Sequence, residues 1–229
     1  MEGIVLAGGF GTRLRGVVSD VPKPMAPIGD KPFLHILLSG LAQKGFKHII
    51  LAIGYLAEKI TDYFGESFRG MDISYVLEDE PLGTGGAVRL AMTKAKSDYV
   101  FVMNGDTFLD VDFVCLDGLW KEHRQPIMVA RNVPDIARYG ALVVQDNRLS
   151  GYIEKGKKGP GVINAGCYVL PIKALDMYEV GKSFSIESDY FQKMYNDLFI
   201  RISQTDGHFI DIGIPEDFER AQTELVIYS

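Results

Sequence analysis

Four charged side chains of this 229-residue chain are of types that handle phosphate groups. Arg13 carries a planar guanidinium that can bind two phosphate oxygens at once, and Lys23 is a compact cation held between two prolines. Asp106 follows the most apolar run of the chain, and Asp211 is flanked by apolar residues. A carboxylate at the end of a buried strand is costly unless it meets a cation, and Mg²⁺ binds carboxylate and phosphate oxygens together. These residue types therefore favour metal-assisted chemistry at a phosphate.

Both carboxylates have an alternative interpretation. Asp106 could cap the following helix, although Asp110 or Asp112 could equally fill that role. Asp211 is either a misplaced charge or a second metal ligand.

A glycine-rich loop opens the chain, in the run Leu6-Ala7-Gly8-Gly9-Phe10-Gly11-Thr12-Arg13-Leu14. Missing side chains let backbone N–H groups approach a ligand closely, and such loops cradle phosphates. A purely structural turn is the alternative. The loop has no Gly-Lys-Ser/Thr and is therefore no P-loop, and Leu14 stands where a dinucleotide fingerprint has its third glycine.

The segments around the glycine-rich loop predict an α/β fold. Apolar runs predict strands that alternate with helices, which implies parallel pairing in a sheet covered on both faces and a ligand site at the carboxyl ends of the strands. The predicted strands cover 3–7, 48–53, 73–77, 99–103 and 127–130, and the predicted helices cover 31–44, 56–64, about 86–96 and 112–123.

The second part of the chain is richer in short strands, predicted at 139–144, 148–153 and 161–170. This β-rich insert is either a substrate-binding lid or an extension of the sheet. Helices are predicted at 173–178 and 187–198, then a strand at 209–213 and a closing helix. We expect one Rossmann-like domain over 1–229, with nucleotide binding mainly in 1–130 and sugar-phosphate binding mainly in 131–229.

Composition excludes several classes of protein. The net charge of −6 argues against a general binder of nucleic acid or anionic membrane. No signal peptide or apolar run of transmembrane length is found, so we expect a cytoplasmic protein.

Cys115 and Cys167 suggest neither a zinc site nor a disulfide framework, and both are expected to be apolar fillers. The four histidines show no pairing with a serine or cysteine and are expected at the surface or at helix caps.

The loop and four later motifs together resemble the sugar-1-phosphate nucleotidyltransferases. The later motifs are Pro22-Lys23-Pro24, Glu78 to Ala87, Gly105-Asp106 and Asp211-x-Gly213-x-Pro215; Ile214 replaces the family's usual threonine. The resemblance implies that Arg13, Lys23 and Asp106 are catalytic and that Asp106 and Asp211 bind Mg²⁺. It implies nucleotide-binding roles for Leu6, Ala7, Gly8, Gly9, Gly11, Thr12, Arg13, Lys23, Glu78, Pro81, Gly83, Thr84 and Gly105. The small residues of the second glycine cluster would let a flat base lie close, whereas flexible turn glycines before a helix are the alternative.

Residues of the insert resemble the family's sugar-phosphate contacts. The implied set is Asn104, Tyr139, Gly140, Glu154, Lys155, Asn164 and Gly166. Glu154 and Asn164 can hydrogen-bond sugar hydroxyls and Lys155 can neutralise a phosphate, although an exposed Glu-Lys pair is also typical of a solvated turn.

Within the family, residues 20–28 and 209–217 look most like the D-glycero-α-D-manno-heptose 1-phosphate guanylyltransferases, which make GDP-heptose for surface glycans. The implied partners are a nucleoside triphosphate, with GTP favoured, and a sugar 1-phosphate; a homo-oligomer is compatible with the sequence. Alternatives are transfer to mannose, glucose or N-acetylmuramic acid 1-phosphate from GTP, UTP, CTP or dTTP. Two other classes are a non-catalytic nucleotide-sugar-binding protein and a redox dinucleotide enzyme, against which the missing third glycine and acidic ribose partner argue.

Overall fold

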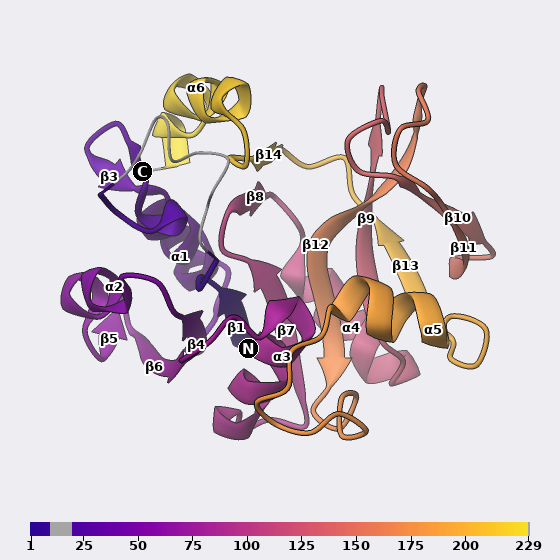
Figure 1. Ribbon diagram of the computed structural model, residues 1–229, viewed down its shortest axis with the longest axis horizontal. Helices are drawn as coiled ribbons and strands as arrows, with labels where there is room; N and C mark the ends of the chain where they lie inside the picture. The colour runs from indigo at the N-terminus through magenta and orange to yellow at the C-terminus, as the bar shows by residue number, and fades with distance from the viewer. Residues whose placement is uncertain (10–19, 229) are drawn as a thin grey trace.

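The computed structural model describes residues 1–9 and 20–228, so Gly11, Thr12 and Arg13 lie outside the described residues. A ten-stranded sheet runs through the described part, in the order β10-β11-β13-β9-β12-β7-β1-β4-β6-β5 (Figure 1). Its strands are β1 (Glu2–Leu6), β4 (His48–Ile53), β5 (Ser67–Phe68), β6 (Met71–Leu77), β7 (Tyr99–Asn104), β9 (Ile127–Val133), β10 (Ala141–Gln145), β11 (Arg148–Ile153), β12 (Gly161–Pro171) and β13 (Arg201–Gln204).

Four neighbouring strands, β6, β4, β1 and β7, pair in parallel and form the core of the sheet. They correspond to the near-continuous apolar runs, as expected for strands buried on both faces. On the insert side β12 runs antiparallel to both β7 and β9, and β10 and β11 pair antiparallel at the edge. The predicted Rossmann-like mixed α/β fold is confirmed. The insert strands are continuous with the main sheet.

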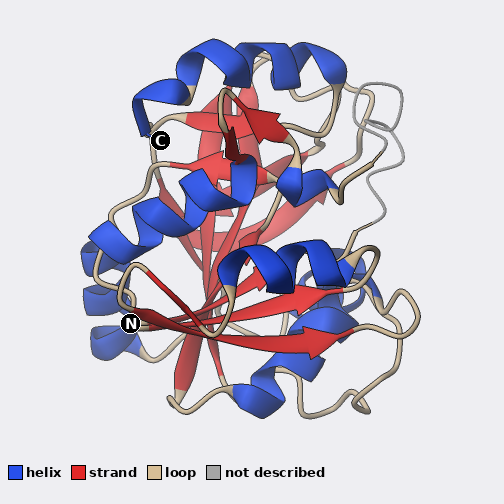
Figure 2. Cartoon of the chain, turned by 90° about the vertical axis from the view of Figure 1, so that its left-hand side faces the viewer, coloured by secondary structure: helices blue, strands red, loops and turns tan. Residues whose placement is uncertain are grey.

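Helices cover both faces of the sheet (Figure 2). Successive residues of β1 point to opposite faces, so Val5 packs with α1 (Phe33–Gln43) and α4 (Phe113–His123), whereas Ile4 packs with α3 (Gly83–Ala91). The other helices are α2 (Ala57–Phe64), a π-helix over Ile186–Phe191, α5 (Gln192–Met194) and α6 (Pro215–Glu224), with short 3₁₀ turns at Lys23–Met25, Met92–Lys94 and Val226–Tyr228.

Two small antiparallel ladders complete the fold. β2 (Pro27–Ile28) pairs with β3 (Lys31–Pro32), and β8 (Thr107–Leu109) pairs with β14 (Phe209–Asp211). In the second ladder Asp211 lies opposite Thr107, and the N–H of Ile212 donates to the carbonyl of Asp106 at 3.0 Å. This ladder brings together two aspartates that are more than a hundred residues apart in the sequence.

Three details differ from the sequence-based expectations. Residues 173–178 form successive turns, because their N–H groups donate three residues back, as from Tyr178 to Leu175, and no α-helical ladder develops. The predicted helix at 187–198 consists of the π-helix and the three-residue α5. The short strand β13 was not predicted from its partly polar sequence. One alternative is settled: Asp112 caps α4, its carboxylate accepting the N–H of Cys115 at 2.9 Å.

Candidate functional site

A cavity of about 350 Å³ lies at the carboxyl ends of the parallel strands. Leu6 ends β1, Asn104 ends β7, Glu78 follows β6, and α3 begins at its rim. Backbone groups at strand ends and helix starts converge there, as is usual for ligand sites in such sheets. Its lining residues are Leu6, Gly8, Gly9, Lys23, Pro24, Glu78, Pro81, Gly83, Thr84, Ala87, Asn104, Asp106 and Gly213.

Lys23 lies between the two predicted metal-binding carboxylates. Its Nζ is 2.5 Å from Asp106 Oδ2 and 3.8 Å from Asp211 Oδ1. The side chain of Lys23 is 8% exposed, so the ammonium is largely removed from water and depends on these two partners. Three of the four charged groups singled out from the sequence therefore lie within one cluster at the cavity, and the fourth, Arg13, lies outside the described residues.

Asp211 is the member of this cluster whose negative charge is least favoured by its surroundings. Burial raises the pKa of its carboxyl, and the nearby charge of Asp106 raises that pKa further. Lys23, the N–H of Gly213 at 2.8 Å and Arg138 at 3.8 Å only partly offset these effects. A site that keeps two carboxylates this close leaves room for additional positive charge.

Glu78 forms the wall opposite β1. Its Oε2 accepts the N–H of Leu82 at 3.0 Å, and burial raises the pKa of its carboxyl. A Cβ at Gly8 would lie 2.4 Å from Glu78 Oε1, so a side chain there would displace the Glu78 carboxylate from its present position. Gly8 therefore lets the opening loop pack closely against Glu78.

The lack of side chains in the second glycine cluster is explained by packing that the sequence did not reveal. A Cβ at Gly83 would lie 2.6 Å from the carbonyl oxygen of Phe184, one at Gly85 would overlap the Phe184 ring, and one at Gly86 would lie 2.4 Å from the carbonyl oxygen of Lys182. These glycines therefore admit the segment 182–187 against α3. Gly83 lines the cavity, whereas Gly85 and Gly86 do not, and packing against residues 182–184 accounts for their lack of a side chain.

The predicted nucleotide-binding residues are placed as follows. Leu6, Gly8, Gly9, Lys23, Glu78, Pro81, Gly83 and Thr84 line the cavity. Ala7 and Gly105 lie behind its wall, where Ala7 N–H donates to the Ala52 carbonyl at 2.8 Å and Gly105 N–H donates to the Leu6 carbonyl at 2.9 Å. The Thr84 hydroxyl turns away from the cavity toward Glu187 and Ile186.

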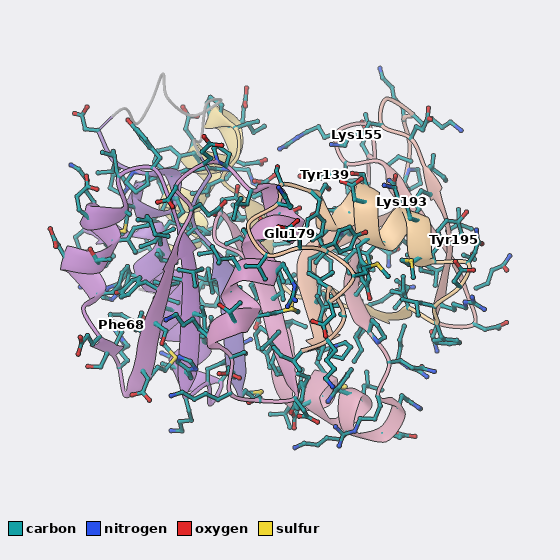
Figure 3. The ribbon with its side chains drawn as sticks, turned by 60° about the horizontal axis from the view of Figure 1, so that its bottom comes forward. Phe68, Tyr139, Lys155, Glu179, Lys193 and Tyr195 are labelled. Atoms are coloured by element: carbon teal, nitrogen blue, oxygen red, sulfur yellow. The ribbon has the colours of Figure 1, made fainter. Side chains whose placement is uncertain are left out.

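The predicted sugar-phosphate residues fall into two sets, Gly140 with Lys155 and Asn104 with Asn164 and Gly166, and of the predicted residues only Asn104 lines the cavity. Tyr139 and Lys155 lie at one end of the insert (Figure 3), and Gly140 packs against the backbone of Ile153 and Lys155. Glu154 and Lys155 are exposed. Asn164 donates from Nδ2 to the hydroxyl of Tyr168 and accepts the N–H of Gly166 with Oδ1.

Several residues at the site were not predicted. Pro24, Ala87 and Gly213 line the cavity, although each is part of a motif that the sequence singled out. Arg138 bridges Asp211 at 3.8 Å and Asp217 at 2.6 Å, and Glu187 and Tyr168 join the two groups of predicted residues. No sequence signal marks Glu187, because its partners come from α3 and β12.

The expectation for the histidines is wrong for His48. Its Nδ1 lies 2.6 Å from Glu2 Oε1 and its Nε2 lies 2.8 Å from Ser74 Oγ, and the ring is buried. This serine–histidine–glutamate row stands at the amino ends of β1 and β4, at the opposite end of the strands from the cavity. His35 is buried as well, whereas Cys115 is exposed and only Cys167 is an apolar filler.

Comparison with known proteins identifies the fold and the chemistry together. The family described as "Nucleotidyl transferase" matches residues 2–226. The chain belongs to this nucleotidyl transferase family. It is 39% identical to the D-glycero-α-D-manno-heptose 1-phosphate guanylyltransferase of Aneurinibacillus thermoaerophilus, over 100% of both chains. It is 40% identical to the enzyme of the same name from Campylobacter jejuni, over 95% of this chain and 97% of that one.

Mannose-1-phosphate guanylyltransferase of Mycobacterium tuberculosis is 34% identical over 99% of this chain and 65% of its own length. Among solved structures, HddC from Yersinia pseudotuberculosis superposes with a TM-score of 0.86 at 36% identity, covering 96% of this chain and 97% of that one, and it has also been solved in complex with GMP-PN. The chain is therefore a sugar-1-phosphate nucleotidyltransferase. In the described part of the chain, every helix is too short or too polar to cross a bilayer.

Proposed function

We propose that this chain joins GTP to D-glycero-α-D-manno-heptose 1-phosphate with Mg²⁺, giving GDP-heptose and pyrophosphate. Two relatives of that name match the chain at about 40% identity over essentially the whole length of both. The observation that carries the chemistry is the cluster of Lys23, Asp106 and Asp211 at the cavity. Use of the product for surface glycans is part of the same proposal.

The two aspartates fit a magnesium ion. Both carboxylates already face one cation, the ammonium of Lys23, and Asp211 keeps a raised pKa because that cation does not fully offset burial and Asp106. The described residues contain no cluster of three or more metal-ligating side chains, so two carboxylates leave the other positions to phosphate oxygens and water. That division is typical of Mg²⁺. When bound, the ion would offset negative charge on the reacting phosphates.

The residues of the chain then act mainly by position and charge. An oxygen of the sugar 1-phosphate attacks the α-phosphorus of GTP; a new P–O bond forms, and the bond to the β-phosphate breaks with its electrons leaving on pyrophosphate. The attacking phosphate is already anionic near neutral pH, so no general base is required. Lys23 stabilises charge around the α-phosphate, and Arg13 is assigned to the leaving pyrophosphate.

Glu78 supports guanine as the base. A carboxylate accepts hydrogen bonds only, and guanine presents two neighbouring donors, N1–H and the 2-amino group. Glu78 lines the cavity, and its orientation is fixed by the N–H of Leu82. Uracil and thymine lack the paired donors, so this wall favours GTP over UTP and dTTP.

The proposal is tested by measuring pyrophosphate release with Mg²⁺ for each of GTP, UTP, CTP, dTTP and ATP against heptose, mannose, glucose, N-acetylmuramic acid and N-acetylglucosamine 1-phosphates. We expect the highest kcat/KM for GTP with the heptose. E78Q should reduce the preference for GTP over UTP by about tenfold or more, the discrimination of one lost hydrogen-bonded pair. D79N, a neighbouring charge removal outside the cavity lining, is the matched control.

Mannose 1-phosphate is the second candidate acceptor, because a mannose-1-phosphate guanylyltransferase matches 99% of this chain. A higher kcat/KM for mannose than for heptose would replace the proposed sugar and keep the chemistry. Tight nucleotide-sugar binding by folded protein that turns over none of the pairs would instead favour a non-catalytic binding protein.

A further inference from the structure

Glu187 is linked to residues of both sets that the sequence assigns to the site: directly to Thr84 of the nucleotide set and, through Tyr168, to Asn164 of the sugar-phosphate set. It belongs to the π-helix over Ile186–Phe191, in a segment that packs against the start of α3. Among the described residues, three hydroxyl groups donate to its carboxylate: those of Thr84 at 2.7 Å, Ser185 at 2.9 Å and Tyr168 at 3.3 Å. Two of these donors come from different walls of the site.

On the nucleotide side, Glu187 fixes the loop that begins α3. Its Oε2 accepts from Thr84, and the Thr84 oxygen in turn accepts the N–H of Ile186 at 3.0 Å. The N–H groups of Gly85 and Gly86 both donate to the Phe184 carbonyl, at 2.9 and 3.3 Å. The loop carrying Gly83 and Thr84, which line the cavity, is thereby tied to the segment that carries Glu187.

On the sugar side, the bonds continue through β12. Tyr168 is fully buried; it donates to Glu187 Oε1 and accepts from Asn164 Nδ2 at 2.7 Å. Asn164 Oδ1 accepts the N–H of Gly166 at 2.9 Å, and Gly166 packs directly against the side chain of Asn104, which lines the cavity. Asn164 therefore uses its amide within the protein and helps to hold the wall.

A second tyrosine, the half-buried Tyr152, lies close enough to Glu187 to feel its charge. Burial raises the pKa of both Tyr152 and Tyr168. In each case the charge of Glu187 is the next largest cause and raises the pKa further. The Tyr152 oxygen is buried with no hydrogen-bond partner among the described residues. Glu187 is thus the shared acceptor of the Thr84, Ser185 and Tyr168 hydroxyls, and the Tyr152 hydroxyl is not among its donors.

We propose that Glu187 is a positioning residue that couples the two walls of the site, through Thr84 on the nucleotide side and through Tyr168 and Asn164 on the sugar side. This role rests on the proposed nucleotidyl transfer. Because the attacking and attacked phosphates are held by different walls, a shift of either wall lowers the rate without removing a reacting group. A buried network of this kind is lost as a unit when its central acceptor changes.

The first test needs no substrate. Residue-resolved amide hydrogen exchange is measured on the full chain, comparing E187Q with E179Q, which removes an exposed charge from the same region of the chain (Figure 3). We expect E187Q to speed exchange at Gly85, Gly86 and Gly166 by about tenfold, and E179Q to leave all three unchanged. Faster exchange confined to residues 185–189, or equal in both variants, would overturn the proposal.

The second test measures turnover with the sugar 1-phosphate that the unmodified protein uses best. E187Q should lower kcat by about tenfold or more with the melting temperature within a few degrees, and a nonreactive GTP analogue should lose its effect on sugar 1-phosphate affinity. An unchanged kcat and unchanged coupling would contradict the role.

Two further variants cover the possibility that E187Q does not fold. T84V and Y168F remove one hydroxyl each, and we expect faster exchange only at Gly85 and Gly86 in the first and only at Gly166 in the second. Combining T84V with E187Q should add little to E187Q alone, since both act on the Thr84–Glu187 hydrogen bond, the first by removing its donor and the second by removing the acceptor's charge. If the unmodified protein turns over no pair, the proposed function fails, while the exchange measurements still decide the role of Glu187.

Discussion

The carboxylates at the two ends of the parallel strands differ in pKa: that of Glu2 at the amino end is lowered, and that of Asp211 at the carboxyl end is raised. At the amino end, Glu2 accepts backbone N–H groups of Lys96 and Ser97 at 2.8–3.1 Å and bonds His48 at 2.6 Å. Burial alone would raise its pKa, but these bonds outweigh burial and lower it. At the carboxyl end, burial and Asp106 together raise the pKa of Asp211 despite Lys23.

The two ends of the strands differ in how far the protein compensates the charge of the carboxylate. Glu2 has its acceptors filled by the protein, so its ionised form stabilises the fold. Asp211 is left with charge that the protein does not fully compensate, and such unrelieved charge is typical of a site that awaits a ligand. We therefore assign the row of serine, histidine and glutamate to stability, whereas the two aspartates and the lysine are the groups that we propose carry the chemistry.

The largest effect is expected at Lys23. K23A removes the cation that faces both aspartates and the reacting phosphates, and we expect kcat to fall by about 10²–10³-fold, the range for losing one preorganised charge at a reacting centre. Steady-state pyrophosphate release measures it, and circular dichroism checks the fold. K31A, which removes a lysine whose ion pair among the described residues is with Asp30 at 3.8 Å, is the control and should keep full activity. Equal activity of the two variants would remove Lys23 from the chemistry.

D211N should separate activity from stability. The amide keeps an acceptor for the Gly213 N–H but removes the charge that burial and Asp106 oppose. We expect turnover to fall by about 100-fold. We expect the free energy of unfolding of the metal-free protein near pH 7 to rise by on the order of 1 kcal/mol, as is common when a destabilising functional residue is replaced. Urea unfolding and pyrophosphate release measure the two changes. A variant that loses stability would show that Asp211 is compensated as well as Glu2.

E2Q should act on stability alone and in a pH-dependent way. The folded-state pKa of Glu2 is lowered, so its stabilising contribution is present above the unfolded pKa of about 4.3 and is lost as pH falls through the folded value. We expect E2Q to cost about 2 kcal/mol near neutral pH, typical of lost bonds to a charged acceptor, and the gap to close in acid. Urea titrations across this range measure it, with exposed Glu66→Gln as the control. A gap that widens in acid would reverse the assignment.

S74A should have the smallest effect. Ser74 bonds His48 Nε2 at 2.8 Å and lies at the far end of the strands from the cavity. We expect a loss of about 1 kcal/mol or less in unfolding free energy and unchanged kcat and KM. A large loss of turnover would make the row functional and erase the contrast between the two ends.

Much of the fold follows from local patterns. The apolar run of β4 places that strand at its observed bounds, since buried strands carry a strong local signal, and β11 is found at its predicted bounds directly after the Asp146-Asn147 turn. The π-helix and β13 escape prediction because tertiary packing forms them. At the site, motif residues such as Lys23 and Asp106 are predictable from the chain itself. Glu187 is not, because its bonds to Thr84 and Tyr168 exist only after segments far apart in sequence have packed.

The most direct measurement is ³¹P NMR of the purified chain with GTP, Mg²⁺ and D-glycero-α-D-manno-heptose 1-phosphate. The proposed reaction predicts that the α- and γ-signals of GTP and the sugar phosphate signal disappear together, replaced by GDP-heptose and pyrophosphate in equal amounts. It also predicts no change when the sugar phosphate is omitted or in D106N. Phosphate release without a sugar nucleotide, or full activity of D106N, would contradict the account.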